Sequence, residues 1–393
     1  MFKGQYVFSQ ITDHLPLHTF RRCVERYHGE RYVKQFRCFD QYLAMSFAQL
    51  THRESLRDIE ACLKAQSSKL YHMGLRSSIS RSTLADANEQ RDWRIYADFA
   101  QALIKIARPL YAGDELGLDL KNTVYALDAS TIDLCFSVFP WALFRSTKSA
   151  VKLHTLLDLR GNIPSFIHIS EGKLHDVNAL DMIIPEAGSF YVMDRAYLDF
   201  ERLFSLNNSG AFFVIRSKNN ILFKRRYSSP VEKTNGIRCD QTIRLTGLNT
   251  KNKYPKPLRR VKYHDNETNK TLNLLTNNEI IPAQTVADLY RYRWKVELFF
   301  KWIKQHLHIR TFFGTSENAL KSQIWIAISV YVLIAIIKKQ LKIKAELYTI
   351  LQVLSLTLFE KIPLEQLLGN SHYMEHTHDN AIQLNLFDNL TGH

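Results

Sequence analysis

The spacing of apolar residues predicts that the first part of the chain is helical. Up to about residue 110, apolar positions recur at intervals of three and four, which is typical of amphipathic helices. The helices predicted from this spacing cover residues 17–27, 40–50, 55–64 and 83–107. Residues 109–117 then read as a linker, because Pro109 and two glycines interrupt the helical pattern.

After the linker, the pattern changes to that of strands. Strands are predicted over residues 124–135, 151–160 and 163–170, with a hairpin turn at Arg160-Gly161-Asn162 between the last two. Short helices at residues 176–184 and 199–207 then alternate with buried strands at residues 189–194 and 211–217. A further core strand is predicted at residues 272–276. Three antiparallel strands followed by alternating helices and strands form the element order of an RNase-H-like α/β fold.

One long helix is predicted after that last strand, between Pro282 and Arg310, where no further proline or glycine occurs and Thr285 can cap the start. At about 100° per residue, four polar side chains fall within an arc of about 60° on it. These side chains are Tyr290, Arg293, Glu297 and Lys304. The adjoining face is apolar, so the polar stripe is expected to run along the rim of the core. A solvated face with ion pairs four residues apart is the plainer alternative.

A continuous apolar run from residue 324 to 337 is predicted to be a buried helix. It is shorter than the roughly 20 residues needed to cross a bilayer. The first residues lack the apolar run of a signal peptide, and the five cysteines are scattered without CxxC spacing. These features predict a cytoplasmic protein with reduced thiols and no membrane partner.

Charge is distributed unevenly along the 393 residues, which carry a formal net charge of +14. Residues 216–270 hold 15 Lys and Arg against 4 Asp and Glu, a balance of +11, whereas residues 111–215 are acidic at −5. An acidic centre between basic segments predicts a metal-binding core flanked by parts that grip a polyanion, nucleic acid first.

Basic side chains that are predicted to contact DNA phosphates gather in the segment 218–270. This segment also has short alternating runs, so it is predicted to be a β-rich insertion. The residues concerned are Lys224, Arg225, Arg226, Arg259 and Arg260.

In the helical first part, a helix capped by Ser82 or Thr83 carries side chains of the kind that read bases in a groove. These side chains are Asn88, Gln90, Arg91 and Arg94. No helix-turn-helix pattern stands out, and a plain helical domain with a mildly basic surface is the alternative.

Two aspartates carry the predicted chemistry, because each follows a run that reads as a buried strand. Tyr125-Ala126-Leu127 precedes Asp128, and Phe190-Tyr191-Val192-Met193 precedes Asp194. An unpaired carboxylate in such a setting is costly unless a cation neutralises it. A few carboxylates with open positions for water and phosphate describe a magnesium site for phosphoryl transfer. Asp133 competes with Asp128, but the buried run favours Asp128.

These residues together resemble a known family. The spacing of Tyr290, Arg293, Glu297 and Lys304 matches, at every position, the YREK signature of the insertion-sequence-four family of DDE transposases. Asp194-Arg195-Ala196-Tyr197 resembles the DRxY segment of that family, and Leu127-Asp128-Ala129-Ser130 resembles its first-strand motif. The family also carries a β-rich insertion between the second aspartate and the glutamate.

The resemblance implies a DNA transposase that moves an insertion sequence by cut-and-paste. Asp128, Asp194 and Glu297 would hold two Mg²⁺ ions, with Mn²⁺ as a substitute, for strand hydrolysis and strand transfer at the element ends. Tyr290, Arg293, Lys304 and Arg195 would contact DNA phosphates. Double-stranded DNA, as terminal inverted repeats and as target, is the implied partner, and cutting two ends makes a homodimer the natural assembly. A metal-dependent nuclease of the same fold and a non-catalytic, transposon-derived DNA-binding protein remain the alternatives.

Near the C-terminus stands a short apolar segment that resembles the motif by which bacterial proteins bind the replication sliding clamp. Its expected contacts come from Gln383, Leu384, Leu386 and Phe387. The predicted organisation is thus a helical DNA-binding domain (1–110), an RNase-H-like core (111–217 and 271–342), a basic β-rich insertion (218–270), a C-terminal helix (343–368) and a disordered tail (369–393).

Overall fold

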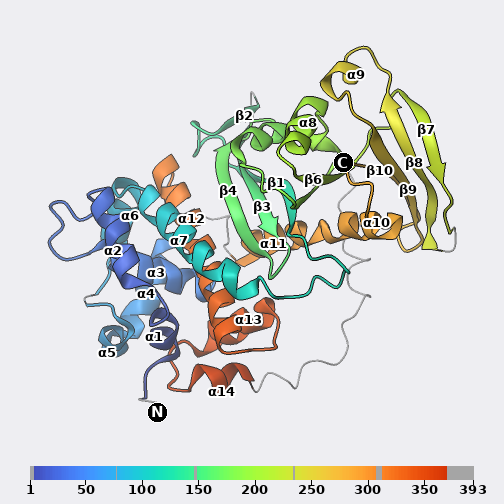
Figure 1. Ribbon diagram of the computed structural model, residues 1–393. Helices are drawn as coiled ribbons and strands as arrows, with labels where there is room; N and C mark the ends of the chain where they lie inside the picture. The colour runs from blue at the N-terminus through green and yellow to red at the C-terminus, as the bar shows by residue number, and fades with distance from the viewer. Residues whose placement is uncertain (1–3, 77, 146–147, 233–234, 307–311, 370–393) are drawn as a thin grey trace.

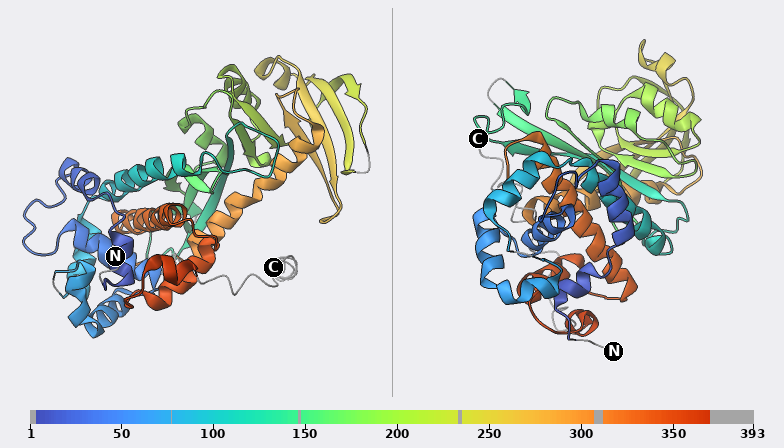
Figure 2. Two further views of the ribbon diagram at one scale, coloured as in Figure 1. Left: turned by 60° about the horizontal axis from the view of Figure 1, so that its bottom comes forward. Right: turned by 90° about the vertical axis from the view of Figure 1, so that its left-hand side faces the viewer.

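A mixed sheet of ten strands forms the centre of the part of the chain that the computed structural model describes, residues 4–76, 78–145, 148–232, 235–306 and 312–369. Helices from both ends of the chain gather on one side of this sheet, and the segment after β6 extends it on the other side (Figure 1). The molecule is elongated, with the helices of the first part of the chain at one end and the strands β7–β9 of the sheet at the other (Figure 2).

The inner strands have RNase-H-like topology. Antiparallel pairing joins β1 (Val124–Leu134), β3 (Lys148–Asp158) and β4 (Ile163–Glu171), while β5 (Phe190–Met193) and β6 (Phe212–Arg216) run parallel to β1. The spatial order is β4-β3-β1-β5-β6. This confirms the predicted fold class. A short strand that the pattern did not predict, β2 (Leu143–Arg145), pairs with the start of β3.

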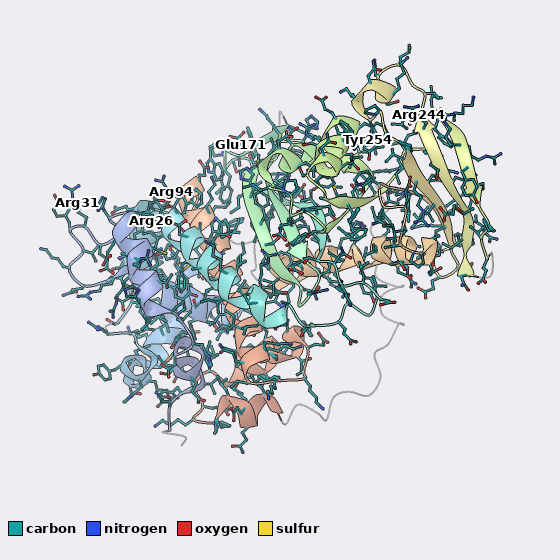
Figure 3. All side chains as sticks on the ribbon, in the orientation of Figure 1. Arg26, Arg31, Arg94, Glu171, Arg244 and Tyr254 are labelled. Atoms are coloured by element: carbon teal, nitrogen blue, oxygen red, sulfur yellow. The ribbon has the colours of Figure 1, made fainter. Side chains whose placement is uncertain are left out.

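The predicted insertion is β-rich, and it continues the core sheet. Antiparallel pairing runs from β6 to β10 (Lys270–Thr276), β9 (Leu258–Asp265), β8 (Ile237–Leu245) and the exposed edge strand β7 (Phe223–Ser229). The ring of Tyr254, after α9 (Thr250–Lys253), packs 5.4 Å from Phe204 and 6.2 Å from Phe213. Tyr254 therefore anchors the insertion where it meets the core (Figure 3).

The first part of the chain is helical, as predicted. Its helices are α1 (Val7–Thr12), α2 (Leu17–Arg26), α3 (Cys38–Leu50), α4 (Leu56–Ala65), α5 (Ser67–Leu70), the 3₁₀ turn η1 (Tyr71–Met73), α6 (Arg81–Gln90) and α7 (Arg94–Tyr111). The predicted helix at 83–107 is wrong in two respects. It is two helices, and Ser80, not Ser82 or Thr83, caps the first by accepting a hydrogen bond from the Thr83 amide. Pro109 belongs to the last turn of α7, so the linker begins later than predicted.

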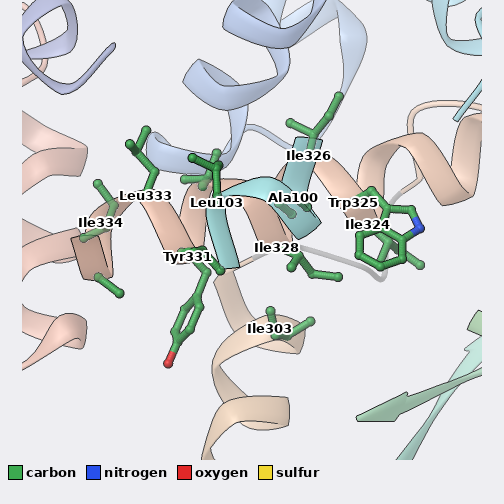
Figure 4. Close-up of a cluster of buried hydrophobic side chains, with 14 of the residues drawn as sticks. Ala100, Leu103, Ile303, Ile324, Trp325, Ile326, Ile328, Tyr331, Leu333 and Ile334 are labelled. Atoms are coloured by element: carbon green, nitrogen blue, oxygen red, sulfur yellow. The ribbon is translucent and has the colours of Figure 1, made fainter. Parts of the chain in front are cut away.

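Helix α12 (Glu317–Gln340) joins the helical end to the sheet. It is the one helix in the described residues that is long and apolar enough to cross a membrane, and 94% of its most apolar 18-residue window is buried inside the protein. Figure 4 shows Leu333 of α12 close to Leu103 of α7, with Ile328 and Ile324 following further along α12. Because helices surround α12, its apolar residues need not follow a single stripe. The predicted buried helix is confirmed.

The remaining helices complete the core and the C-terminal end. They are η2 (Asp176–Met182), η3 (Arg195–Tyr197), α8 (Phe200–Asn208), α10 (Ala283–Tyr292), α11 (Trp294–His306), α13 (Leu347–Thr357) and α14 (Leu364–Gly369). The single C-terminal helix predicted for residues 343–368 is therefore two helices. The amides of Val7 and Phe8 donate to carbonyls of Glu360 and Leu358, so the C-terminal segment closes on α1.

The predicted hairpin turn between β3 and β4 packs against the helices α7 and α12. Gly161 has a φ of 74°, and a Cβ there would lie 2.2 Å from the ring of Tyr111. The Tyr111 hydroxyl donates to the Ala335 carbonyl at 2.7 Å, and the Tyr331 hydroxyl donates to the Asn162 carbonyl at 2.9 Å. Glycine at residue 161 thus lets the sheet approach α7 and α12.

The Gly161→Ala variant should be less stable than the Gly188→Ala variant. Gly188 also has a positive φ, 80°, but a Cβ there meets nothing within 4 Å. Both changes impose left-handed backbone strain of about 1–2 kcal/mol, and only the first adds overpacking of about 1–3 kcal/mol. Urea unfolding of the two variants measures the difference, and equal losses would contradict close docking of this turn.

Candidate active site

Asp128 and Asp194 lie beside each other in the sheet, Asp128 inside β1 and Asp194 directly after the end of β5. The parallel pairing of β1 with β5 sets Leu127 opposite Met193, and the two aspartates are the next residues along each strand. The Asp194 carboxylate caps η3 by accepting a hydrogen bond of 2.7 Å from the Ala196 amide. The carboxyl ends of strands in open α/β sheets are where ligands bind. Asp194 lies at such an end, and the pairing of β1 with β5 sets Asp128 beside it.

Glu297 reaches the site from α11. The long helix predicted from Pro282 onward is divided at Arg293 into α10 and α11, and Thr285 lies inside its first turn, since Pro282 is the cap residue. Around the division, the Arg293 amide donates to Tyr290 and the Val296 amide donates to Arg293, which are bonds of the tighter, three-residue type. The side chains of Leu289, Val296 and Phe299 are buried, as the apolar face predicted.

Arg293 joins two of the three carboxylates. Its Nη1 donates to Asp128 Oδ2 at 2.9 Å, and its Nη2 donates to Glu297 Oε1 at 2.6 Å. The guanidinium also lies over the ring of Tyr290, 5.6 Å from its centroid. Only 14% of the Arg293 side chain is exposed, so these ion pairs are stronger than surface pairs but also cost more desolvation.

The pKa of Asp128 is raised by its burial. Burial raises it to about 6, although Arg293 and the Ala129 amide lower it. The charges of Asp194 and Glu297 make a smaller contribution that also raises it. A further cation beside Asp128 would favour the ionised form of this carboxyl.

The acid residues fit a divalent metal by donor chemistry, since all three supply the carboxylate oxygens that Mg²⁺ prefers. Within the described ranges, no three His, Cys, Asp or Glu side chains are placed to hold one metal ion together. Instead, Arg293 lies between Asp128 and Glu297 as their countercharge. The raised pKa of Asp128 is the observation that fits a metal here.

Tyr197, in the DRxY segment, adds a buried hydroxyl beside these acids. Its side chain has no exposed surface, and its hydroxyl has no hydrogen-bond partner among the described residues. Burial, then the charges of Asp128, Asp176 and Asp194, raise the pKa of Tyr197 far above its ordinary value. This phenol therefore remains a neutral donor next to the carboxylates.

Arg216 is a site residue that the sequence analysis missed. It lines two cavities, one of about 860 Å³ with Tyr290, Arg293 and Trp294, and one of about 270 Å³ with Arg195. Its positive charge lowers the pKa of Tyr290, against the larger effect of burial. The sequence did offer one signal for Arg216, its position at the end of β6. In the register of the sheet, this position corresponds to those of Asp128 and Asp194.

The predicted phosphate contacts of the insertion divide into two groups. Lys224, Arg225 and Arg226 are exposed on β7. Arg259 is 8% exposed, and its guanidinium forms a two-pronged ion pair with Asp240 at 2.8 and 2.7 Å. For Arg259 the predicted DNA contact is wrong, because this side chain holds β9 to β8.

Arg260, Arg195 and Lys304 have different surroundings. The guanidinium of Arg260 donates to Gln241 and Asn273 at 2.9 and 2.8 Å and lies over the ring of Phe223, so it too supports the insertion. Arg195 is exposed beside Asp194, and Lys304 is exposed on α11. Of these three, Arg195 and Lys304 present their charges on the surface.

Two of the base-reading residues considered in the helical part are buried. Asn88 accepts a hydrogen bond of 2.7 Å from Gln41, and the Arg91 guanidinium is enclosed as well. The interpretation is therefore wrong for Asn88 and Arg91, whose polar groups are used within the fold. Gln90 and Arg94 are exposed, and Arg94 pairs with Asp92 at 2.5 Å on the surface.

Comparisons with known proteins show which proteins this chain is similar to. Residues 119–333 match the family described as "Transposase DDE domain", and residues 3–76 match a domain of unknown function. The transposase-named protein y4zB of Sinorhizobium fredii is 31% identical over 71% of this chain and 77% of its own length. A transposase named for the insertion sequence IS5377 of Geobacillus stearothermophilus is 32% identical over 55% of this chain and 57% of its own length.

A solved structure, the piggyBac transposase synaptic complex with hairpin DNA, aligns with a TM-score of 0.44 at 12% identity. The alignment covers 91% of this chain and 79% of that one.

The RNase-H-like fold and the family match define an enzyme that acts on DNA. The chain belongs to the DDE transposase family, of the insertion-sequence-four-like type. Its function is that of a DNA transposase, and a DDE domain implies a divalent metal requirement. The predicted family and enzyme class are confirmed.

Without metal, the Asp128→Asn variant should be at least as stable as the wild type above pH 6. A folded-state pKa raised from 3.8 to about 6 means that ionisation opposes folding. This cost, about 2–3 kcal/mol, develops between pH 4 and 6 and is absent below pH 4. Melting in EDTA across pH 4–8 measures it.

The matched control is Asp133→Asn, on the exposed part of the same strand, which should not reproduce this pH profile. Added Mn²⁺ should raise the melting temperature of the wild type and of Asp133→Asn but not that of Asp128→Asn. A metal-induced shift of equal size in all three proteins would remove Asp128 from the metal site.

Proposed function

We propose that this transposase moves an insertion sequence by cut-and-paste, using Asp128, Asp194 and Glu297 to hold two Mg²⁺ ions, for which Mn²⁺ substitutes. The observation that supports this proposal is that Arg293 binds Asp128 and Glu297 simultaneously. In addition, burial raises the pKa of Asp128, and the neighbouring acids raise it further. When bound, such a metal pair stabilises the attacking and leaving oxygens of an in-line displacement at phosphorus. The reactions proposed are hydrolysis of one strand at each element end and transfer of the freed 3′ end to target DNA.

Arg293 has a double role in this proposal. In the structure it pairs with two acids, and the small exposed part of its side chain lines the larger cavity. A planar guanidinium suits a phosphate oxygen. Arg293 would therefore orient the scissile phosphate against the acids, with the Tyr290 ring packed beneath it.

Arg216 and Arg195 would guide the DNA strand past the acids. Arg216 lies between the two cavities and Arg195 lines the smaller one, together with Lys218. Phosphate contacts of this kind fix position without reading sequence. Lys304 would extend the path along α11, and Lys224, Arg225 and Arg226 would contact DNA from the exposed edge strand β7.

A homodimer on paired DNA ends, acting at the nucleoid in the cytoplasm, completes the proposal. Two element ends need two copies of the acid cluster for concerted cutting, and the cavities described above are built from one chain. Sedimentation of the protein with and without element-end DNA measures the stoichiometry.

The proposed sliding-clamp contact rests on sequence alone, because Gln383, Leu384, Leu386 and Phe387 lie outside the described residues. Replacing Leu386 and Phe387 by Ala should reduce binding to the clamp of a bacterial replisome at least roughly tenfold, since both would fill an apolar pocket. Surface plasmon resonance measures this loss. A Leu390→Ala variant is the control, and equal binding by both proteins would contradict the contact.

Incubation with labelled element ends, target plasmid and Mg²⁺ tests the chemistry directly. The wild type should give nicked ends and joined products, whereas nicks alone would indicate a nuclease. Glu297→Gln and Asp194→Asn should each lower nicking at least roughly 100-fold, because each removes a metal ligand.

The Arg216→Gln variant should lower nicking roughly tenfold, mainly by weakening DNA binding through one lost phosphate contact. Lys344→Gln, an exposed charge beyond α12, is its charge-matched control. If Arg216→Gln nicks like this control at subsaturating DNA, Arg216 does not line the strand path.

A further inference from the structure

We propose that the loop of residues 27–37, between α2 and α3, is a DNA-docking element of this transposase, and that Arg31, Tyr32 and Lys34 make the contact. The loop lies in the region that matches a domain of unknown function. This inference rests on the proposed function, and it assigns a DNA surface to the helical part, where Asn88 and Arg91 are buried and used inside the fold. In Figure 1 the loop projects from the helical end, away from the sheet.

The base of the loop is fixed to the helical core. The buried guanidinium of Arg91 donates to the carbonyls of Phe36 and Arg37, and it lies over the ring of Phe36. On the other side of the loop, a Cβ on Gly29 would lie 2.4 Å from Ile95, so backbone and helix are in close contact. A rigid base with an exposed tip is the arrangement by which scaffolds present binding loops.

The tip of the loop exposes an aromatic side chain in an unfavourable backbone conformation. Tyr32 is 87% exposed with a φ of 63°. Arg31 stacks on its ring at 5.0 Å, and Arg31 Nη2 donates to the Tyr32 hydroxyl at 3.2 Å. Backbone strain persists where the surroundings impose it and is concentrated at functional sites. An exposed tyrosine stacked with an arginine offers a surface for a base or a sugar.

The charge around the tip favours a polyanion. Arg31, Lys34 and Arg37 are exposed, and none forms an ion pair with an acid among the described residues, nor do Arg21 and Arg22 of α2. Arg26 differs, because it pairs with Asp98.

Two acids face this surface, Glu25 on α2 and Glu30 at the loop base. The carboxylate of Glu30 accepts a hydrogen bond from the Cys38 amide. The segment 21–37 holds six Lys and Arg against these two acids. A net positive surface with an exposed aromatic is the composition that DNA contacts require. Figure 3 shows Arg31 at the outermost edge of the helical end.

The test measures DNA binding in EDTA, where no strand is cut, by fluorescence anisotropy with a labelled 40-base-pair duplex that carries an element end and with a scrambled duplex. Arg31→Ala/Lys34→Ala should bind both duplexes roughly tenfold more weakly, and the dependence of log K on log salt should become shallower by about 2. Tyr32→Gly should lose roughly fivefold with the salt slope unchanged, since stacking is lost but no charge is. Glycine relieves the positive φ, so this variant should fold at least as stably as the wild type.

The matched control is Lys344→Ala/Tyr348→Ala, which removes an exposed charge and an exposed tyrosine near α13 and should bind like the wild type. The proposal would be overturned if both loop variants kept the affinity and the salt slope of the wild type. It would also be overturned if the control variant bound DNA as weakly as the loop variants do. Loss of a DNA-free dimer in the loop variants would assign the loop to protein contact and overturn it too. Nicking at saturating DNA should persist in the loop variants. If the wild type binds DNA through this loop but never cuts it, the proposed chemistry fails and the docking element stands.

Discussion

The centre of this structure depends on one interaction, the contact of Arg293 with two acids inside the protein. Its guanidinium pairs with Asp128 of the sheet and with Glu297 of α11 through different nitrogens of one planar group. Burial still raises the pKa of Asp128, although Arg293 lowers it. A buried carboxyl of this kind is stabilised in its charged form by each further cation placed beside it.

The rest of the fold keeps that cluster in place. The pairing of β1 with β5 fixes both aspartates, and α12 holds the sheet against the helical end through Tyr331 and the Ala335 carbonyl. At the opposite end, the insertion adds strands to β6 by backbone pairing, so its exposed cations are rigidly related to the acids. The site thus lies between two basic surfaces, the 27–37 loop and β7, along the elongated molecule (Figure 2).

Several errors of the sequence analysis share one cause. Arg259, Asn88 and Arg91 have the composition of DNA contacts, yet each is buried and uses its polar groups within the fold. Arginine and asparagine carry donors that satisfy carbonyls and carboxylates as well as phosphates, so their type does not say which they meet. Arg216 was missed because a single arginine at a strand end has no motif around it that distinguishes it from a structural arginine.

By itself, the sequence determined the fold class and the family, because strand and helix periods and the YREK spacing are local properties of the chain, and it proposed the three acids as the site. It also determined that residue 161 had to be a turn. Tertiary structure decided which charges face solvent and which are paired, where the long helix divides at Arg293, and that the insertion joins the core sheet. The physical reason is that pairing, burial and desolvation arise between segments far apart in sequence, as between Arg293 and Asp128, and no local pattern records them.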